Sequence, residues 1–196
     1  MSRKAEALWS GPFGDAYTER NLRISSKRME FWQHIATIYR PKRVLEVGCN
    51  HGANLRHLAQ FLDPQEIWGA DINKGALEQA RDLSPEISFV MASGFDLPFR
   101  DGYFDLVFTV GVLIHQPPHD LPPFMTELAR CSSRYVLAVE YVDTTFVEIP
   151  YRGFDEALYR GPYGEAYRKM GMMLMETGKL GKDSGFDDCT YWVLKK

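Results

Sequence analysis

The fold is decided by Val44-Leu45-Glu46-Val47-Gly48-Cys49-Asn50-His51-Gly52, a short apolar strand that runs into a glycine turn. Glycine suits such a turn because the backbone must bend sharply and must let a ligand approach with no Cβ in the way. Exposed amides at the start of the helix that follows can hold a polar or anionic ligand group. The stretch therefore predicts a strand–turn–helix unit with a ligand site at the carboxyl end of the strand.

A carboxylate stands at the end of the next predicted strand. Asp71 follows Gly48 by 23 residues, close to the spacing at which an acidic residue reaches ribose hydroxyls in nucleotide-binding units. A dinucleotide fingerprint requires G-x-G-x-x-G, whereas three other residues separate Gly48 from Gly52. The spacing thus disfavours a nicotinamide cofactor, although an oxidoreductase on a similar fold stays the alternative.

Strands and helices alternate along the chain, which is typical of parallel βαβ units. A helix is expected over residues 24–39, with Ser25 or Ser26 as its cap and Pro41 as its stop. The predicted strands cover residues 43–47, 66–71, 87–91, 103–110, 134–141, 172–177 and 190–194, and the predicted helices cover 52–61, 74–83, a segment from Asp120 through 128, and 161–169. The fold class is therefore α/β, a doubly wound sheet of about seven strands that ends in an antiparallel hairpin, with an N-terminal helical cap.

The size and composition indicate one globular domain of 196 residues, with a cap over 1–42, a core over 43–141 and a substrate-side segment over 142–196. Three cysteines cannot all pair and have no C-x-x-C spacing, which favours a reducing cytoplasm and predicts no metal site. No apolar run reaches about 18 residues and no signal-peptide core is present, so we expect neither export nor membrane insertion.

The net charge of −3 argues against a nucleic-acid partner, but it is unevenly distributed. Residues 1–43 hold nine Lys/Arg and four Asp/Glu, a net charge of +5, whereas residues 44–196 hold 14 and 22, a net charge of −8. A basic segment on an acidic body is either a solvated helix face or a means of attracting an anionic substrate.

Four successive motifs resemble the signatures of class I methyltransferases, which have a Rossmann-like fold and use S-adenosylmethionine. The motifs are Glu46 to Gly52, Ala70-Asp71-Ile72-Asn73, Phe95-Asp96-Leu97-Pro98-Phe99 and Phe104-Asp105-Leu106-Val107. The resemblance covers about residues 43–141. It implies that S-adenosylmethionine binds to Glu46, Gly48, Cys49, Asn50, Gly52, Asp71, Ile72, Ser93, Gly94, Phe95, Thr109, Gly111 and Val112.

The sequence departs from this family at Ser93, where an Asp often holds the amino group of adenine. Adenine is then held by Ser93, by a backbone group near Gly94, or by stacking on Phe95.

The flanking segments resemble a narrower group, the methylases associated with pseudaminic acid biosynthesis. The segments are Trp9 to Asn21, Gly111-Val112-Leu113-Ile114-His115 and Val147 to Gly153. This resemblance implies a small-molecule acceptor.

Two residues at strand ends are candidate catalytic groups. His115 follows the fourth strand at the edge where doubly wound sheets bind ligands, so it is either a general base or a side chain that packs the loop before Pro117. Glu140 ends the fifth strand and is either a proton acceptor or a carboxylate paired with an arginine.

The remaining candidates form the acceptor side. Polar, aromatic and cationic side chains predicted to bind the substrate are Tyr17, Arg20, Asn21, Tyr141, Glu148, Tyr151 and Arg152, with Arg23 and Arg160 as further cations. An arginine such as Arg152 grips a carboxylate or phosphate bidentately, or forms a surface salt bridge instead. We therefore expect methyl transfer to a small, polar, anionic metabolite, with a homodimer possible; an oxidoreductase and a non-catalytic cofactor-binding relative are the alternatives.

Overall fold

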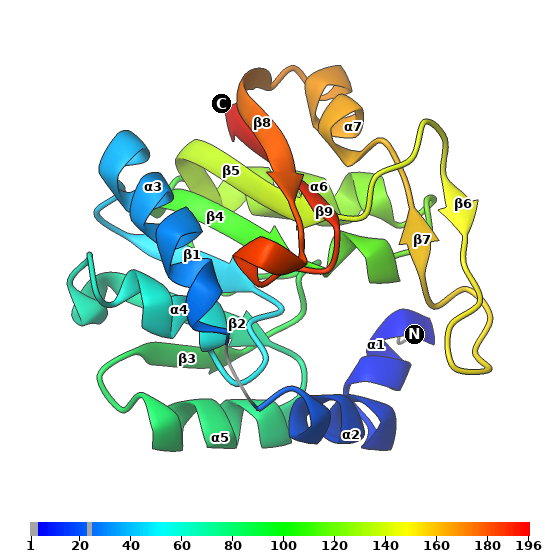
Figure 1. The fold of residues 1–196 in the computed structure, drawn as a ribbon, viewed down its shortest axis with the longest axis horizontal. Coiled ribbons are helices and arrows are strands. Elements are labelled where there is room, and N and C mark those ends of the chain that lie inside the picture. Colours follow the sequence, from blue (N-terminus) through cyan, green and yellow to red (C-terminus); the bar gives the residue numbers. More distant parts are fainter. Residues whose placement is uncertain (1–3, 23–24) are drawn as a thin grey trace.

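A seven-stranded sheet forms the centre of the computed structural model, which describes residues 4–22 and 25–196 (Figure 1). In the order in which they lie side by side, the strands are β3 (Ser88–Met91), β2 (Ile67–Asp71), β1 (Val44–Val47), β4 (Phe104–Val110), β5 (Ser132–Glu140), β9 (Cys189–Lys195) and β8 (Met173–Leu180). The first five are parallel, and β9 runs antiparallel to both of its neighbours. The predicted doubly wound sheet with a terminal antiparallel hairpin is confirmed.

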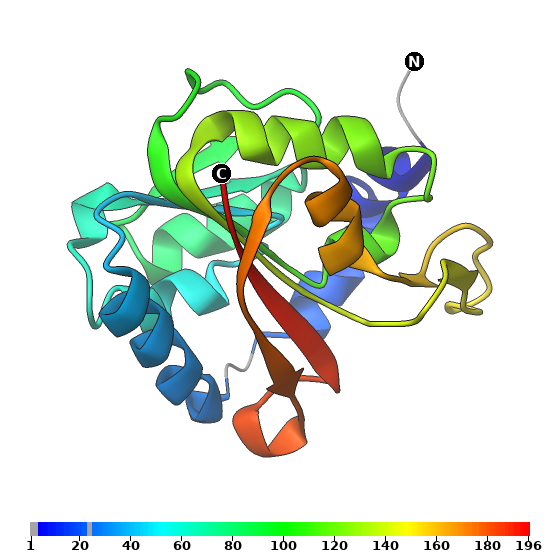
Figure 2. The same cartoon turned by 90° about the horizontal axis from the view of Figure 1, so that it is seen from above.

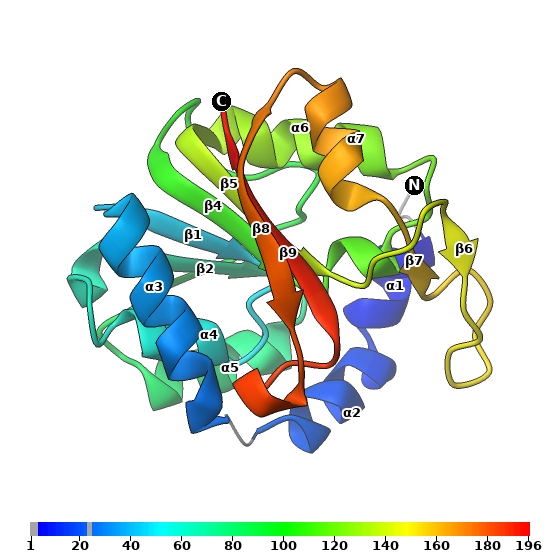
Figure 3. The ribbon, with the colours of Figure 1, turned by 45° about the horizontal axis from the view of Figure 1, so that its top comes forward.

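Helices cover both faces of the sheet (Figures 2 and 3). One face is packed by α3 (Met29–Tyr39), α4 (Ala53–Leu58) and α5 (Lys74–Leu83), and the other by α6 (Leu121–Cys131) and α7 (Tyr163–Lys169). The first core is anchored by Trp32, which is fully buried against Phe108 with 4.9 Å between ring centroids. Tyr163 and Tyr167 are fully buried in the second core.

Helix ends follow the local sequence. Asn73 caps α5 by accepting a hydrogen bond from Ala76 N at 2.7 Å, as an N-cap side chain does. The helix predicted over 24–39 begins as a 3-10 turn, Ser26–Arg28, capped by Ser25, and it ends at left-handed Arg40 before Pro41. Residues 23 and 24, and with them the predicted cation Arg23, lie outside the described residues.

Two segments lie beyond the carboxyl ends of the parallel strands (Figure 1). The N-terminal cap is a pair of short helices, α1 (Lys4–Trp9) and α2 (Pro12–Arg20), and a two-stranded sheet is made by β6 (Val147–Glu148) and β7 (Tyr159–Arg160). The sequence predicted a helical cap but not the small sheet. None of the helices in the described ranges is long and apolar enough to cross a membrane.

Candidate functional site

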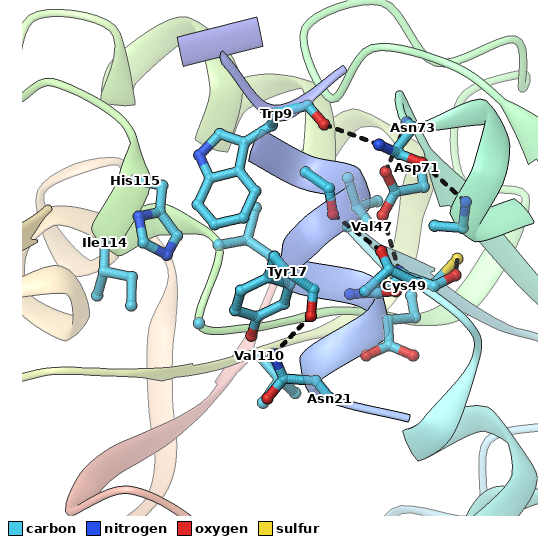
Figure 4. Close-up of a pocket in the computed structure, with 18 of the residues that line it drawn as sticks. Trp9, Tyr17, Asn21, Val47, Cys49, Asp71, Asn73, Val110, Ile114 and His115 are labelled. Atoms are coloured by element: carbon cyan, nitrogen blue, oxygen red, sulfur yellow. Dashed lines mark hydrogen bonds between the residues drawn. The ribbon is translucent and has the colours of Figure 1, made fainter. Parts of the chain in front are cut away.

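A pocket of about 690 Å³ opens at the carboxyl ends of β1, β2 and β4, in the size range of small-molecule sites (Figure 4). Its walls combine the loops after these strands with the cap helices, the segment around Tyr151 and the turn before β9. The strand order reverses between β1 and β4, where open α/β sheets bind their ligands.

The glycine turn after β1 forms one wall. Gly48 has a φ of 74°, a conformation that favours glycine, and a Cβ there would lie 2.5 Å from a Val112 methyl group. The Gly48 amide donates to Ala70 O at 2.8 Å, which ties the turn to β2. Cys49 and Asn50 also line the pocket, whereas Gly52 lies behind the turn as the N-cap of α4.

Asp71 lies at the end of β2 and holds the loops on both sides of it. One carboxylate oxygen accepts from Asn50 N at 2.7 Å and the other from Asn73 N at 2.8 Å. Desolvation raises the pKa of this carboxyl, while these backbone hydrogen bonds act to lower it. Each carboxylate oxygen has a second lone pair, so Asp71 can still accept hydrogen bonds from ligand hydroxyls.

Glu46 carries an unpaired oxygen beneath the pocket. The side chain is 1% exposed, and its Oε1 accepts from Asn54 Nδ2 at 2.6 Å. Oε2 is buried and has no hydrogen-bond partner within the described part of the chain. Desolvation raises the pKa of Glu46 to about 8. A buried acceptor without a donor is costly, and a cationic or donating ligand group in the pocket would satisfy it.

The loop after β3 forms an apolar end of the pocket. Gly94 lies so close to the Phe124 ring that a Cβ would be 2.3 Å from it, and Phe95 packs edge-on against Phe124 at 4.8 Å. Ser93 was expected to line the pocket but does not. Its hydroxyl donates a hydrogen bond to a carboxylate oxygen of Glu6, and Glu6 lines the pocket. Sequence reasoning missed Glu6, because no local pattern connects it to a residue 87 positions away.

The floor is made by the loop after β4. Gly111 and Val112 line the pocket, but Thr109 and Glu140 lie beneath them and are fully buried. Glu140 accepts from Thr109 Oγ1 at 2.8 Å and from the backbone amides of Val112 and Ile114 at 3.3 Å. Glu140 therefore braces the loop from below: full burial keeps it from facing a substrate, and it forms no salt bridge with an arginine of the described ranges, so neither role that the sequence left open matches its position.

His115 lines the pocket and is 8% exposed. Its Nδ1 lies 2.6 Å from Ala157 O, and because a carbonyl can only accept, Nδ1 carries the proton and Nε2 keeps a lone pair. Burial lowers the pKa of His115 to about 4, so the ring is neutral at pH 7. Trp9 packs against it with 4.4 Å between ring centroids (Figure 4).

Cationic and aromatic side chains line the rest of the pocket. The predicted substrate-side residues that line it are Tyr17, Arg20, Asn21, Tyr141, Tyr151 and Arg152, and Arg28 joins them. None of these arginines forms a salt bridge in the described ranges, and Asp187 is an acidic residue on the same side.

Two expected substrate-side groups lie elsewhere. Glu148 is exposed on β6, where it accepts from Glu156 N at 2.5 Å. Arg160 lies over the Tyr141 ring, 5.9 Å from its centroid, and does not line the pocket. In both cases a strand of the small β6–β7 sheet, which the sequence did not predict, directs the side chain away.

Besides the Ser93–Glu6 hydrogen bond, the cap is held to the loops after β2 and β1 through Asn73 and His51. Asn73 Nδ2 donates to Trp9 O at 3.1 Å, as Figure 4 shows, and also to Asp15 Oδ1 at 2.8 Å. His51 Nε2 lies 2.8 Å from Asn21 O and therefore donates to it, while Arg56 donates to His51 Nδ1 at 3.0 Å. The cap thus lies over the loops after β1 and β2 as well as the acceptor side, where the sequence alone placed it.

The fold is that of class I methyltransferases. The chain is similar to the magnesium protoporphyrin IX methyltransferase of Synechocystis with bound SAM (TM-score 0.70, 15% identity, 100% of this chain and 98% of that one). It is also similar to the 1,6-didemethyltoxoflavin-N1-methyltransferase of Burkholderia thailandensis (TM-score 0.75, 14% identity, 100% and 91%).

Residues 44–134 match the family model described as a methyltransferase domain. A curated relative is the fatty-acid O-methyltransferase of Mycolicibacterium smegmatis, 38% identical over 91 residues that make up 45% of this chain and 32% of that one. The chain spans about a third of the length of the curated relatives it matches. The Synechocystis neighbour holds bound SAM, the cofactor that the motifs of this chain imply. The narrower likeness to pseudaminic acid methylases is not shown by these comparisons, which match proteins named for lipid acceptors.

Proposed function

We propose that this protein transfers a methyl group from S-adenosylmethionine to an oxygen or nitrogen atom of a small, polar, anionic metabolite. The observation that carries the proposal is one pocket in which a buried, unpaired carboxylate oxygen of Glu46 and the accepting side chain of Asp71 adjoin three arginines without ion-pair partners among the described residues. The methyltransferase-domain match favours this reaction over the oxidoreductase alternative.

The chemistry of the donor set fits the cofactor. The positive ammonium group would favour the ionised form of Glu46 and donate to its unpaired oxygen, and Asp71 would accept from the ribose hydroxyls through its remaining lone pairs. Ile72, Gly94 and Phe95 would enclose adenine in the apolar end of the pocket. When bound, the cofactor supplies a methyl group already activated on a sulfonium, so the protein's task is to position the acceptor and to remove a proton where needed.

His115 is the group that would take that proton. Its Nδ1–H is occupied by Ala157 O, which leaves the Nε2 lone pair as the basic site, and the lowered pKa keeps the ring neutral and ready to accept. With a hydroxyl acceptor, Nε2 would accept the proton that the hydroxyl must lose when it is methylated. An amine acceptor depends less on this step.

The anionic character of the acceptor rests on Arg20, Arg28 and Arg152. Arg28 is held in place by hydrogen bonds to Gly185 O at 2.9 Å and Asn54 Oδ1 at 3.0 Å, and Arg20 and Arg152 are exposed at the pocket. The carboxylate of the cofactor's methionine part would pair with one of them, and Arg28 is placed for this because its partner Asn54 also binds Glu46; the other two cations would be left for an anionic acceptor. An acidic sugar, its nucleotide-linked form or a related carboxylated natural product is such an acceptor, in keeping with the resemblance of the flanking segments to pseudaminic acid methylases.

The test has two stages. Calorimetry should first detect S-adenosylhomocysteine binding, and labelled cofactor should then be used to screen acidic sugars, their neutral analogues and a fatty acid as acceptors. We expect turnover of acidic sugars only. Turnover of the fatty acid alone would replace the sugar class with a lipid one, and binding without turnover of any acceptor would favour a non-catalytic relative.

A further inference from the structure

Among the described residues that line the apolar end of the pocket, Glu6 contributes a carboxylate. Glu6 belongs to cap helix α1 and lines the pocket together with its neighbour Ala5. One of its oxygens accepts from the Ser93 hydroxyl, and Glu6 takes part in no salt bridge within residues 4–22 and 25–196. The neighbouring cation of the helix, Lys4, is paired instead with Glu156 at 2.9 Å.

The order of the strands tells which part of the cofactor reaches this end. Glu46 is on β1, Asp71 ends β2 and the Ser93–Phe95 loop follows β3, and these three strands lie in that order across the sheet. The cofactor has its ammonium at one end, ribose in the middle and adenine at the other end. With the ammonium at Glu46 and the ribose at Asp71, adenine lies past β2.

The walls at that position suit a flat purine ring. They are apolar or small, and consist of Ile72, Ala92, Gly94, Phe95 and Phe124. Among the pocket-lining residues of this end, Glu6 carries the acceptor that could meet the hydrogen-bonding edge of the base. A carboxylate has no proton to donate, so it attracts an amino group and repels a carbonyl oxygen.

We propose that Glu6 accepts a hydrogen bond from the exocyclic amino group of adenine, with the Ser93 hydroxyl holding the carboxylate in position. The proposal rests on the cofactor assignment of the proposed function and deepens it. Adenine is then recognised by a residue of the cap and not by one of the sheet, so the cofactor site is complete only with the cap in place.

The test compares S-adenosylhomocysteine with S-inosylhomocysteine, in which a carbonyl oxygen replaces the amino group. The wild-type protein should bind the adenine compound roughly ten- to a hundredfold more tightly in calorimetry, as expected for a hydrogen bond to a charged group. In Glu6→Gln the preference should fall to about threefold or less, because an amide can donate to the carbonyl as well as accept from the amine. Glu19→Gln, an exposed change on α2 of the same cap, should keep the wild-type preference.

A second variant separates recognition from packing. Glu6→Ala should lose the preference, and Ser93→Asp added to it should restore the preference by supplying a carboxylate from the β3 loop. An unchanged preference in Glu6→Gln, or an equal loss of affinity for both compounds, would overturn the role of Glu6 and leave the cofactor assignment intact. Wild-type protein that binds neither compound would refute the cofactor assignment and this proposal together.

Discussion

The side chain of Asn73 connects the cap to the loop after β2, and its amide oxygen and amide nitrogen have different roles. Its Oδ1 caps α5 through Ala76 N, and its Nδ2 donates to Trp9 O and Asp15 Oδ1. Asn73→Asp keeps the capping oxygen, removes both donors and sets a carboxylate against Asp15. Asn73→Ala removes the cap of α5 as well and serves as the comparison.

We expect Asn73→Asp to weaken closure of the cap by roughly 2 kcal/mol. The neutral hydrogen bond to Trp9 O accounts for about 1 kcal/mol, and the bond to Asp15, which is exposed and screened by solvent, for about the same. A change of this size corresponds to an increase of about thirtyfold in the opening equilibrium.

Amide hydrogen exchange resolves the two roles. In Asn73→Asp, exchange in α1 and α2 should accelerate by about thirtyfold, while α5 stays protected and the free energy of global unfolding changes little. In Asn73→Ala, α5 should also lose protection, since loss of an N-cap costs about 1 kcal/mol. Unchanged exchange in the cap of Asn73→Asp would refute the role of Asn73 in holding the cap closed. Acceleration spread over the whole sheet would show a general loss of stability instead.

Three further predictions concern charged groups of the pocket. Asp71→Ala should weaken S-adenosylhomocysteine binding in calorimetry by roughly ten- to a hundredfold, because it removes a charged acceptor from the ribose, and unaltered affinity would make the assignment of Asp71 wrong. Arg152→Ala should raise the KM for an acidic acceptor several-fold or more with kcat little changed, whereas Arg160→Ala, outside the pocket, should not; equal behaviour of the two variants would remove the anionic-acceptor idea. The pKa of Glu46 is raised to about 8 in the folded protein, whereas the unfolded chain releases this proton above about pH 4.5. The contribution of Glu46 to the free energy of unfolding therefore falls as the pH rises from about 4.5 to about 8. Urea unfolding should therefore show a weaker loss of stability from pH 5 to pH 8 in Glu46→Gln than in the wild type, with Glu19→Gln as the exposed control, and identical pH slopes would contradict the burial of an ionisable Glu46.

The parallel core was predictable because its signals are local. The glycine turn at Gly48, the carboxylate at Asp71 and the alternation of strands with helices each lie within a few residues or one βαβ unit. The same spacing brought Glu46, Asp71 and His115 to one pocket, as the sequence indicated.

The side chains that differ from expectation depend on direction and on distant contacts. Glu140 and Glu148 both lie in strands, and no local pattern tells whether such a carboxylate turns under a loop, as Glu140 does, or toward solvent. Glu6 and Asn73 acquire their roles from partners 87 and 64 positions away, respectively, which a periodicity cannot reveal. The roles assigned to residues of the pocket stay predictions to be tested by the variants above.

One property follows from the contacts of the cap with both halves of the pocket, through Glu6 at the β3 end and through Trp9 against His115. If the proposed donor and acceptor each favour the closed cap, each lowers the free energy that the other must spend on closure, and the two would bind with positive cooperativity. Thermodynamic reciprocity requires that each raise the affinity of the other by the same factor. In the proposed reaction the two products would inherit this linkage, so that departure of the first would loosen the second.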